Sequence, residues 1–359
     1  MNRILGVALV SLLALAGCSK KDEPAPARDS YVYEPVRAAS AAIAVVSKPD
    51  ATRALFLGDE AKRLVPYFER LGVRPMARAE GRVDILVIAC GEMSRESLAR
   101  AAGLVSANGI VVWLMDLEKV TMGRFKAMLE SFALEGATLW MPGESRWVAV
   151  GRKVPRRIKL SATLEVFNRE RAFADLLSGG CGSLGELFAN YAGTLEDVMP
   201  AFAASPDAGA LVRPEYFLTK EIPSASWLAA EDTDGDIAKS VADDIRSMQV
   251  VRRLVIEGGL RSQAAKDRKD EEAAIDCWSR AIKRNPGELF VRERLDRLER
   301  NARGFLSCGK VLQAMKCYET MVLVKPTAAS VNNFGQCLKK IGKLDLAEQV
   351  LRRAKELEK

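Results

Sequence analysis

The stretch from residue 51 to residue 92 constrains the fold more than any other part of the chain. An apolar run at 53–57 stops at Gly58 and passes into 61–71, where apolar residues recur with the period of a helix. The next run, 83–89, is apolar on both faces, as expected of a strand in the middle of a parallel sheet. Strand, tight turn, helix and buried strand in this order predict an α/β domain.

The chain continues this alternation as far as residue 151. Because strands that alternate with amphipathic helices pair in parallel, helices are expected on both faces of the sheet. The last two strands are joined by 142–145, which contains Pro and Gly and predicts an antiparallel hairpin at a sheet edge. The predicted helices are 37–47, 61–71, 95–106 and 122–134, and the predicted strands are 54–57, 84–89, 110–115, 138–141 and 147–151, with an extended piece at 74–79.

No histidine occurs among the 359 residues. The chain therefore has no His-based catalytic triad, no histidine general base and no His-containing metal site. The formal net charge is +7, and we expect the excess of basic residues to be spread along the chain. Because no dense basic run is interleaved with aromatic residues, nucleic-acid binding is not expected.

Residues 1–17 have the pattern of a signal peptide. Arg3 gives a short positive start, 4–13 is an apolar core too short for a permanent membrane span, and small residues lead to Cys18. The segment that ends at Cys18 resembles a bacterial lipobox, in which acyl chains are attached to the cysteine. This resemblance implies a lipoprotein that is anchored in a lipid membrane through Cys18. The alternative is an ordinary secretory signal with an incidental cysteine.

The residues after Cys18 bear on location and redox state. Ser19 stands where an aspartate typically retains such lipoproteins at the inner membrane, so the outer membrane is favoured, at its periplasmic face or at the cell surface. Residues 18–36 are polar and interrupted by prolines, which predicts a flexible tether.

An exported chain permits disulfides, but without a CxxC pair buried free thiols are favoured over a disulfide framework. The cysteines concerned are Cys90, Cys181, Cys277, Cys308, Cys317 and Cys337.

Four segments follow one another along the chain: 53–58, 83–89, 109–112 and 213–217. Together and in this order they resemble the spermidine synthase-like branch of the class I methyltransferases. The last of them, Arg-Pro-Glu-Tyr-Phe, is similar to a late RPxLEF-like segment of that family. The resemblance extends over 37–225 and implies a Rossmann-like class I methyltransferase sheet, in a domain at 37–230, with an S-adenosylmethionine site beside the first strand.

The chain departs from this family where the cofactor would bind. In the family the first strand runs into a GxGxG-type loop, whose glycines let the backbone approach the nucleoside. Here only Gly58 remains, and Asp59 and Glu60 follow it with side chains expected to fill that space. These three residues are the degenerate counterpart of the cofactor site, and no bound cofactor is expected. Glu80 is the nearest match to the family's acidic residue that binds the ribose.

The catalytic position of the family is also changed. The resemblance places a proton-accepting aspartate at the end of the strand 84–89, and Ala89 stands there. Because alanine cannot accept a proton, no catalytic residue is assigned. An alternative is that Glu92 serves as the base, and the other interpretation of Glu92 is a helix cap or a solvent-exposed residue.

Two further stretches contain residue types that occur in binding or catalytic sites. Residues 179–183 are glycine-rich but follow a helical pattern, which predicts a helix stop and a loop, and Cys181 has no histidine to activate it. Residues 232–236 resemble part of a calcium loop, but Ile237 stands where the loop needs glycine. An acidic cap on a helix that begins near Ile237 is favoured, and no metal is expected.

From residue 238 the pattern is helical only, and it repeats. Gly309 and Ala314 recur 33 residues later as Gly342 and Ala347. This period resembles tetratricopeptide (TPR) repeats, and an earlier copy contains Trp278 and Pro286. The resemblance implies a C-terminal α-helical TPR-like solenoid over 238–359, whose concave face binds a protein or peptide partner. The alternative is that the repeats only buttress the α/β domain.

Together these features predict a membrane-anchored lipoprotein that acts as a non-catalytic scaffold or protein-binding module. The rival prediction is an enzyme, a polyamine synthase-like transferase that uses S-adenosylmethionine or its decarboxylated form. A third possibility is that the same crevice binds a different ligand of the cell envelope, since a fold does not determine a function.

Overall fold

The computed structural model describes residues 35–358 with internal gaps, and the described residues fall into two compact units. The first is Glu34–Leu260 and the second begins at Arg261. The division between the units falls within helix α12 (Gly235–Ala264), which begins three residues before the predicted start of the repeats at 238. The residues outside the description are 1–34, 79–80, 92, 133, 144, 155–156, 168–182, 205–206, 218–227, 230–232, 265–267, 286–294 and 359.

The first unit is built on a seven-stranded mixed sheet with the order β2-β1-β3-β4-β6-β5-β8. Strands β2, β1, β3 and β4 pair in parallel, whereas β6 is antiparallel to both of its neighbours and β8 is antiparallel to β5. The α/β prediction is thereby confirmed. The strands are β1 (Arg53–Leu57), β2 (Arg74–Met76), β3 (Val83–Ala89), β4 (Val105–Asp116), β5 (Glu135–Trp140), β6 (Arg146–Arg152) and β8 (Tyr191–Thr194).

The predicted hairpin exists, but its predicted place at the sheet edge is wrong. Strand β6 lies between β4 and β5, and β8 covers the other side of β5. Strand β8 was not predicted, because it has only four residues and its pairing with β5 includes a register shift between Leu139 and Trp140. Ring contacts hold it in place, since Tyr191 lies 4.7 Å from Trp140 between centroids.

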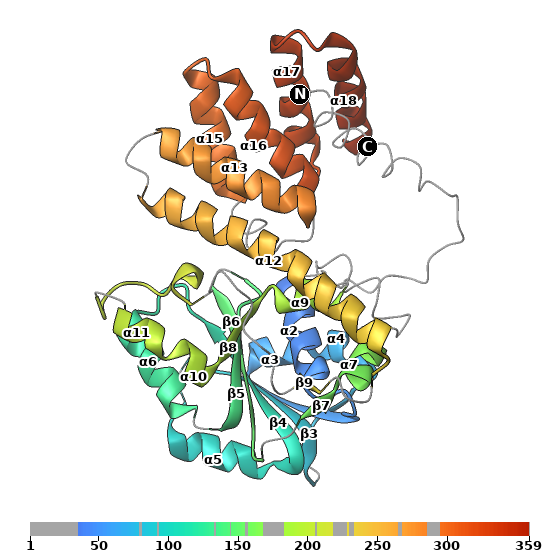
Figure 1. The fold of residues 1–359 in the computed structure, drawn as a ribbon, viewed down its shortest axis with the longest axis vertical. Helices are drawn as coiled ribbons and strands as arrows, with labels where there is room; N and C mark the ends of the chain where they lie inside the picture. Colours follow the sequence, from blue (N-terminus) through green and yellow to red (C-terminus); the bar gives the residue numbers. More distant parts are fainter. Residues whose placement is uncertain are drawn as a thin grey trace. The chain divides into compact units, whose positions relative to one another are not determined.

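Helices cover both faces of the sheet, as predicted. Figure 1 shows α2, α4 and α7 on one side and α6, α10 and α11 on the other. The predicted helix at 61–71 is two short helices instead, because Pro66 in the first turn of α4 has no N–H to continue α3. The helices are α2 (Pro35–Val46), α3 (Asp59–Lys62), α4 (Val65–Arg70), α5 (Arg95–Gly103), α6 (Met122–Ser131), α7 (Leu160–Phe167), α9 (Leu184–Phe188), α10 (Leu195–Val198) and α11 (Pro200–Ala204).

The two faces of β6 show how the core is filled. Trp147 packs edge-on against Phe125 of α6, with 5.1 Å between ring centroids, and Phe217 of the Arg-Pro-Glu-Tyr-Phe segment lies 5.3 Å from the same Trp147. Arg152 lies an odd number of residues from Trp147, so its side chain points to the other face of the sheet. Its Nη2 donates to the carbonyl of Ser47, the residue after α2, at 2.5 Å. The segment 213–217 is therefore a core anchor of the first unit.

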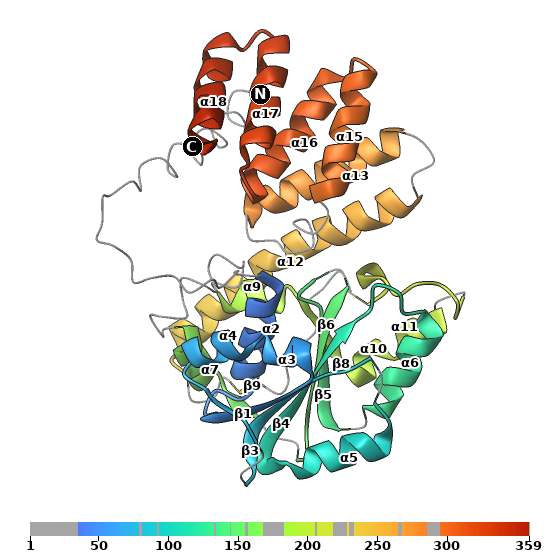
Figure 2. The same cartoon turned by 180° about the vertical axis from the view of Figure 1, so that it is seen from behind.

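The second unit is helical. Its described helices are α13 (Arg268–Arg284), α15 (Leu295–Ser307), α16 (Val311–Val324), α17 (Ala328–Lys340) and α18 (Leu344–Leu357). Helix α16 packs against α13, α15 and α17, and α17 packs against α18. Figure 2 shows α15 with α16 and α17 with α18 as neighbouring antiparallel hairpins.

The two hairpins repeat the same turn. Gly309 and Gly342 both have positive φ, 71° and 78°. The N–H of Lys310 donates to the carbonyl of Phe305 at 2.9 Å, and the N–H of Lys343 donates to that of Leu338 at 3.0 Å. The 33-residue period of the sequence therefore has a counterpart in the backbone geometry.

Candidate functional site

The turn between β1 and α3 is the place where a cofactor would bind if the family resemblance held in full. It consists of one residue, because β1 ends at Leu57 and α3 begins at Asp59. Gly58 has φ 95° and ψ 154°, a conformation that is open almost only to glycine. A Cβ at Gly58 would lie 2.4 Å from the carbonyl oxygen of Ala89. The Gly58 backbone thus lies directly against the end of β3.

The two acidic residues after Gly58 do not fill the space as expected. The Asp59 side chain is 93% exposed and pairs with Lys62 at 3.2 Å. Glu60 bridges Arg37 of α2 at 3.0 Å and Arg63 at 2.7 Å. The space at this turn is taken up by the contact between the backbones of Gly58 and Ala89. The Asp59 and Glu60 carboxylates face solvent and basic partners instead.

The end of β3 carries no carboxylate in the described residues. Ala89 ends the strand, and the carbonyl of Cys90 accepts a hydrogen bond from Trp113 Nε1 at 3.0 Å. Burial raises the pKa of the Cys90 thiol, which lowers its thiolate fraction and disfavours it as a nucleophile. Glu80 and Glu92, the alternative acidic residues, lie outside the described part of the chain.

Asp84 lies at the opposite, amino-terminal end of β3 and has a structural role. Its Oδ2 accepts hydrogen bonds from the N–H of Thr52 at 3.0 Å, from Thr52 Oγ1 at 3.0 Å and from the N–H of Arg53 at 3.1 Å. Partial burial by itself raises the pKa of Asp84, but these three bonds, helped by the charge of Lys48, outweigh it and lower the pKa. The carboxylate ties β3 to the start of β1.

The two remaining sequence candidates act as helix caps where they are described. Asp234 Oδ1 accepts from the N–H groups of Asp236 at 2.9 Å and Ile237 at 3.3 Å, which confirms the acidic cap on α12. Ser183 caps α9 through a reciprocal pair of bonds with Glu186. Cys181 lies outside the described residues, as does the lipidation candidate Cys18. Within the described ranges, no three Cys, Asp or Glu residues lie close enough to hold a metal ion.

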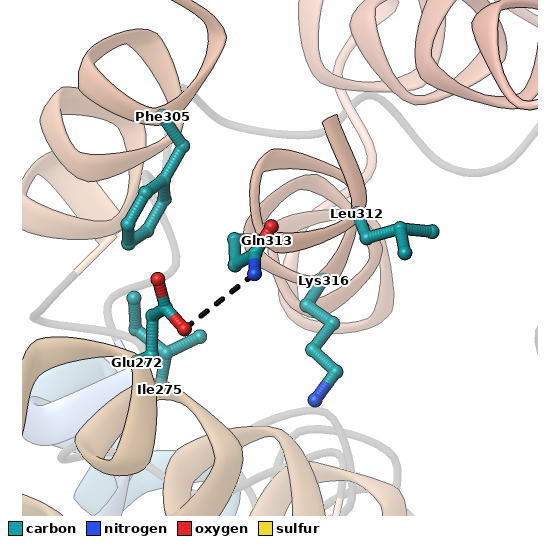
Figure 3. Close-up of a pocket in the computed structure, with 6 residues that line it drawn as sticks. All are labelled: Glu272, Ile275, Phe305, Leu312, Gln313 and Lys316. Atoms are coloured by element: carbon teal, nitrogen blue, oxygen red, sulfur yellow. Dashed lines mark hydrogen bonds between the residues drawn. The ribbon is translucent and has the colours of Figure 1, made fainter. Parts of the chain in front are cut away.

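A pocket that the sequence did not predict lies in the second unit, between α13, α15 and α16. Its volume is about 210 Å³. Ile275 and Phe305 are buried in its lining, whereas Leu312 is 53% exposed. Figure 3 shows Gln313 directed toward Glu272, with the Phe305 ring beside the same carboxylate. The lining residues are Glu272, Ile275, Phe305, Leu312, Gln313 and Lys316.

Charged groups are arranged in pairs around this pocket. Lys310 Nζ lies 2.6 Å from Glu272 Oε1 and 6.0 Å from the centre of the Phe305 ring. Lys316 Nζ lies 3.2 Å from Asp276 Oδ1. Each pair joins an acidic residue of α13 to a lysine. Lys316 belongs to α16, and Lys310 directly precedes that helix.

The excess of basic residues is concentrated in the helical unit, so the expectation that it is spread along the chain is wrong. Residues 261–359 contain 22 Lys and Arg against 14 Asp and Glu, so they hold more than the whole net charge of +7.

The cysteines of this unit fit their prediction in part. Cys277, Cys317 and Cys337 are buried, and burial raises the pKa of Cys317 to about 12, but Cys308 is exposed.

Comparison with known protein families, with characterised proteins and with solved structures gives no match to this chain. Among the helices that the structure describes, none has both the length and the apolar character needed to cross a lipid bilayer.

Proposed function

We propose that this chain is a lipid-anchored, non-catalytic protein-binding module of the cell envelope. Its first unit is a degenerate class I methyltransferase-like domain, and its second unit is a TPR-like helical region that contacts the partner. The observation that carries the non-catalytic part is the one-residue turn at Gly58, which lies against Ala89.

The strand arrangement supports a methyltransferase-like origin for the first unit. Four parallel strands are followed by a hairpin whose second strand, β6, is inserted in antiparallel orientation beside β4. This closing hairpin is what the family resemblance implies. The late segment 213–217 also has a definite place in the core, where Phe217 packs on Trp147.

The chemistry at the carboxyl end of the sheet argues against S-adenosylmethionine. A nucleoside at the first turn needs bare backbone with room above it, and the Gly58 backbone has no free space toward β3. A transfer to an amine also needs a proton acceptor, and Ala89 supplies a methyl group. Neither requirement of the enzyme interpretation is met by a described residue.

Calorimetric titration of the full chain tests the non-catalytic part. S-adenosylmethionine and its decarboxylated form are titrated separately, and neither is expected to release measurable heat at millimolar concentrations. Micromolar binding of either compound would overturn this part and favour the transferase.

Cross-linking in intact cells tests the partner-binding part. An amine-reactive cross-linker reports which lysines lie near another protein, because both units carry exposed lysines. We expect links to a second protein from Lys325, Lys339 and Lys355 of the helical unit. Links confined to Lys119 and Lys126 of the α/β unit would contradict a partner site on the helices.

The anchor is tested separately, through Cys18. Mass spectrometry of the mature N-terminal peptide is expected to show an acylated cysteine, and Cys18→Ala is expected to abolish the modification. An unmodified Cys18 in membrane-free protein would favour an ordinary secretory signal.

A further inference from the structure

We propose that the pocket between α13, α15 and α16 binds one bulky apolar side chain of an acidic peptide segment. The proposal rests on the protein-binding function above and names the chemistry of the partner. The partner's side chain enters against Ile275 and Phe305, and a neighbouring carboxylate of the peptide pairs with Lys316.

The size of the pocket selects a single side chain. Sites for whole drug-sized ligands occupy about 300–1,000 Å³, and this pocket has about 210 Å³. Ile275 and Phe305 give it an apolar lining, and Leu312, 53% exposed on the first turn of α16, is a further apolar residue of the lining whose side chain points away from these two (Figure 3). A leucine or phenylalanine side chain of a partner would cover this exposed surface and gain from its removal from water.

The lysines differ in how strongly they are engaged. The Lys310–Glu272 pair is short, at 2.6 Å, and its carboxylate is mostly buried. The Lys316–Asp276 pair is longer, at 3.2 Å, with side chains 51% and 47% exposed. Exposed pairs contribute little, so exchange of Asp276 for a ligand carboxylate costs little. Lys316 is therefore the cation that an incoming acidic group meets.

Two further observations concern the charge of the bound peptide and the contact that its backbone makes. The unit has 22 basic and 14 acidic residues, which attracts an acidic segment and disfavours a basic one. Gln313 Nε2 donates to Glu272 Oε2 at 3.5 Å, a long bond that is easily given up. The Gln313 amide can turn to a peptide carbonyl or N–H of the bound segment.

The probe is the acetylated and amidated pentapeptide Asp-Asp-Leu-Asp-Asp, titrated into the full chain. Methyl NMR follows the δ1 methyl of Ile275. We expect saturable shifts of this methyl, with no saturable shift for Asp-Asp-Ala-Asp-Asp or for Lys-Lys-Leu-Lys-Lys. Lys316→Glu is expected to weaken binding by about tenfold, the loss of one charged contact. Lys355→Glu, an exposed lysine of α18 with the same charge change, is the control.

A second pair of variants tests the apolar contact without disturbing the core. Leu312→Ser is expected to weaken the peptide by several fold, whereas Leu344→Ser, at a residue 57% exposed and outside the pocket lining, leaves it unchanged. Equal losses in the two variants, absence of any Ile275 shift, or equal binding of the lysine peptide would overturn the proposal. Cross-links to the helical unit in cells would still stand in that case, so failure of this pocket is distinguishable from failure of the proposed function.

Discussion

Glu319 of α16 and Lys283 of α13 form an ion pair with 3.2 Å between Oε2 and Nζ. The Glu319 side chain is only 6% exposed, so its carboxylate lies inside the helical unit. A buried charge is tolerated when a partner of opposite sign compensates the lost hydration. The pair therefore links α13 to α16, three residues along α16 from the pocket residue Lys316.

Removing one member of this pair is expected to cost more than removing both. Lys283→Met leaves the Glu319 carboxylate buried without its partner and is expected to lower the stability of α16 by about 2–4 kcal/mol. The double variant Lys283→Met, Glu319→Leu is expected to recover most of that loss. Hydrogen exchange of the α13 and α16 amides measures both values. Additive losses in the double variant would show that the two residues act independently.

Gly58→Ala is expected to destabilise the α/β unit by about 2–4 kcal/mol. The cost has two sources, because alanine disfavours φ 95° and because its Cβ would lie 2.4 Å from the Ala89 oxygen. Urea unfolding followed by tryptophan fluorescence measures the loss. Gly91→Ala is the matched control, since a Cβ there meets nothing within 4 Å. A Gly58→Ala variant as stable as the control would refute the contact between β1 and β3.

Asp84→Asn is expected to destabilise the α/β unit in a pH-dependent manner. The folded-state pKa of Asp84 lies below its ordinary value of 3.8, so the carboxylate stabilises the fold above that pH, and the contribution is lost as the pH falls through the folded pKa. At pH 7 the variant should lose about 1–2 kcal/mol, the value of hydrogen bonds to a charged acceptor. The difference from the parent should shrink below about pH 4.

The same urea titrations at pH 7 and pH 3 test this dependence. Asp59→Asn serves as the control, because the Asp59 side chain is 93% exposed and its substitution is expected to leave the free energy of unfolding almost unchanged at both pH values. A loss for Asp84→Asn that is equally large at pH 3 would show that the carboxylate charge has no part in it.

Gly309→Ala and Gly342→Ala are each expected to cost about 1 kcal/mol in the helical unit. Both glycines have positive φ, and a Cβ meets no atom within 4 Å at either, so the cost is conformational only. Gly304→Ala, inside α15 and equally open, is expected to stabilise by about 0.5–1 kcal/mol. Hydrogen exchange of the following helices gives the three values, and unequal effects at Gly309 and Gly342 would argue against a true repeat.

The local patterns of the sequence predicted most of the sheet, because strands such as β3 and β4 are long and apolar. They also placed a tight turn at Gly58, directly after the first strand. The expectation that the side chain of Asp59 fills the space at this turn is wrong, because Asp59 faces solvent. The contact is made between Gly58 and Ala89, which is distant along the chain. A backbone contact of this kind has no signature in composition or period.

The pocket could not be predicted for a related reason. Glu272 and Lys316 belong to different helices, and whether they meet depends on how α13 packs on α16. Strand β8 shows the same limit, because four residues without alternation carry too little pattern to be recognised. What did repeat in the sequence, Gly309 and Gly342, repeats in the turns, because glycine is required there by φ.

Helix α2 is enclosed by the sheet, α4 and α7, and nearly all of its side chains are buried. It is also the first described element after the segment that leads from Cys18, and the 17 residues from Cys18 to Glu34 span at most about 60 Å when fully extended. With acyl chains on Cys18, any mechanical pull from the bilayer would be transmitted into the hydrophobic centre of the α/β unit, and that unit would remain within one tether length of the membrane surface.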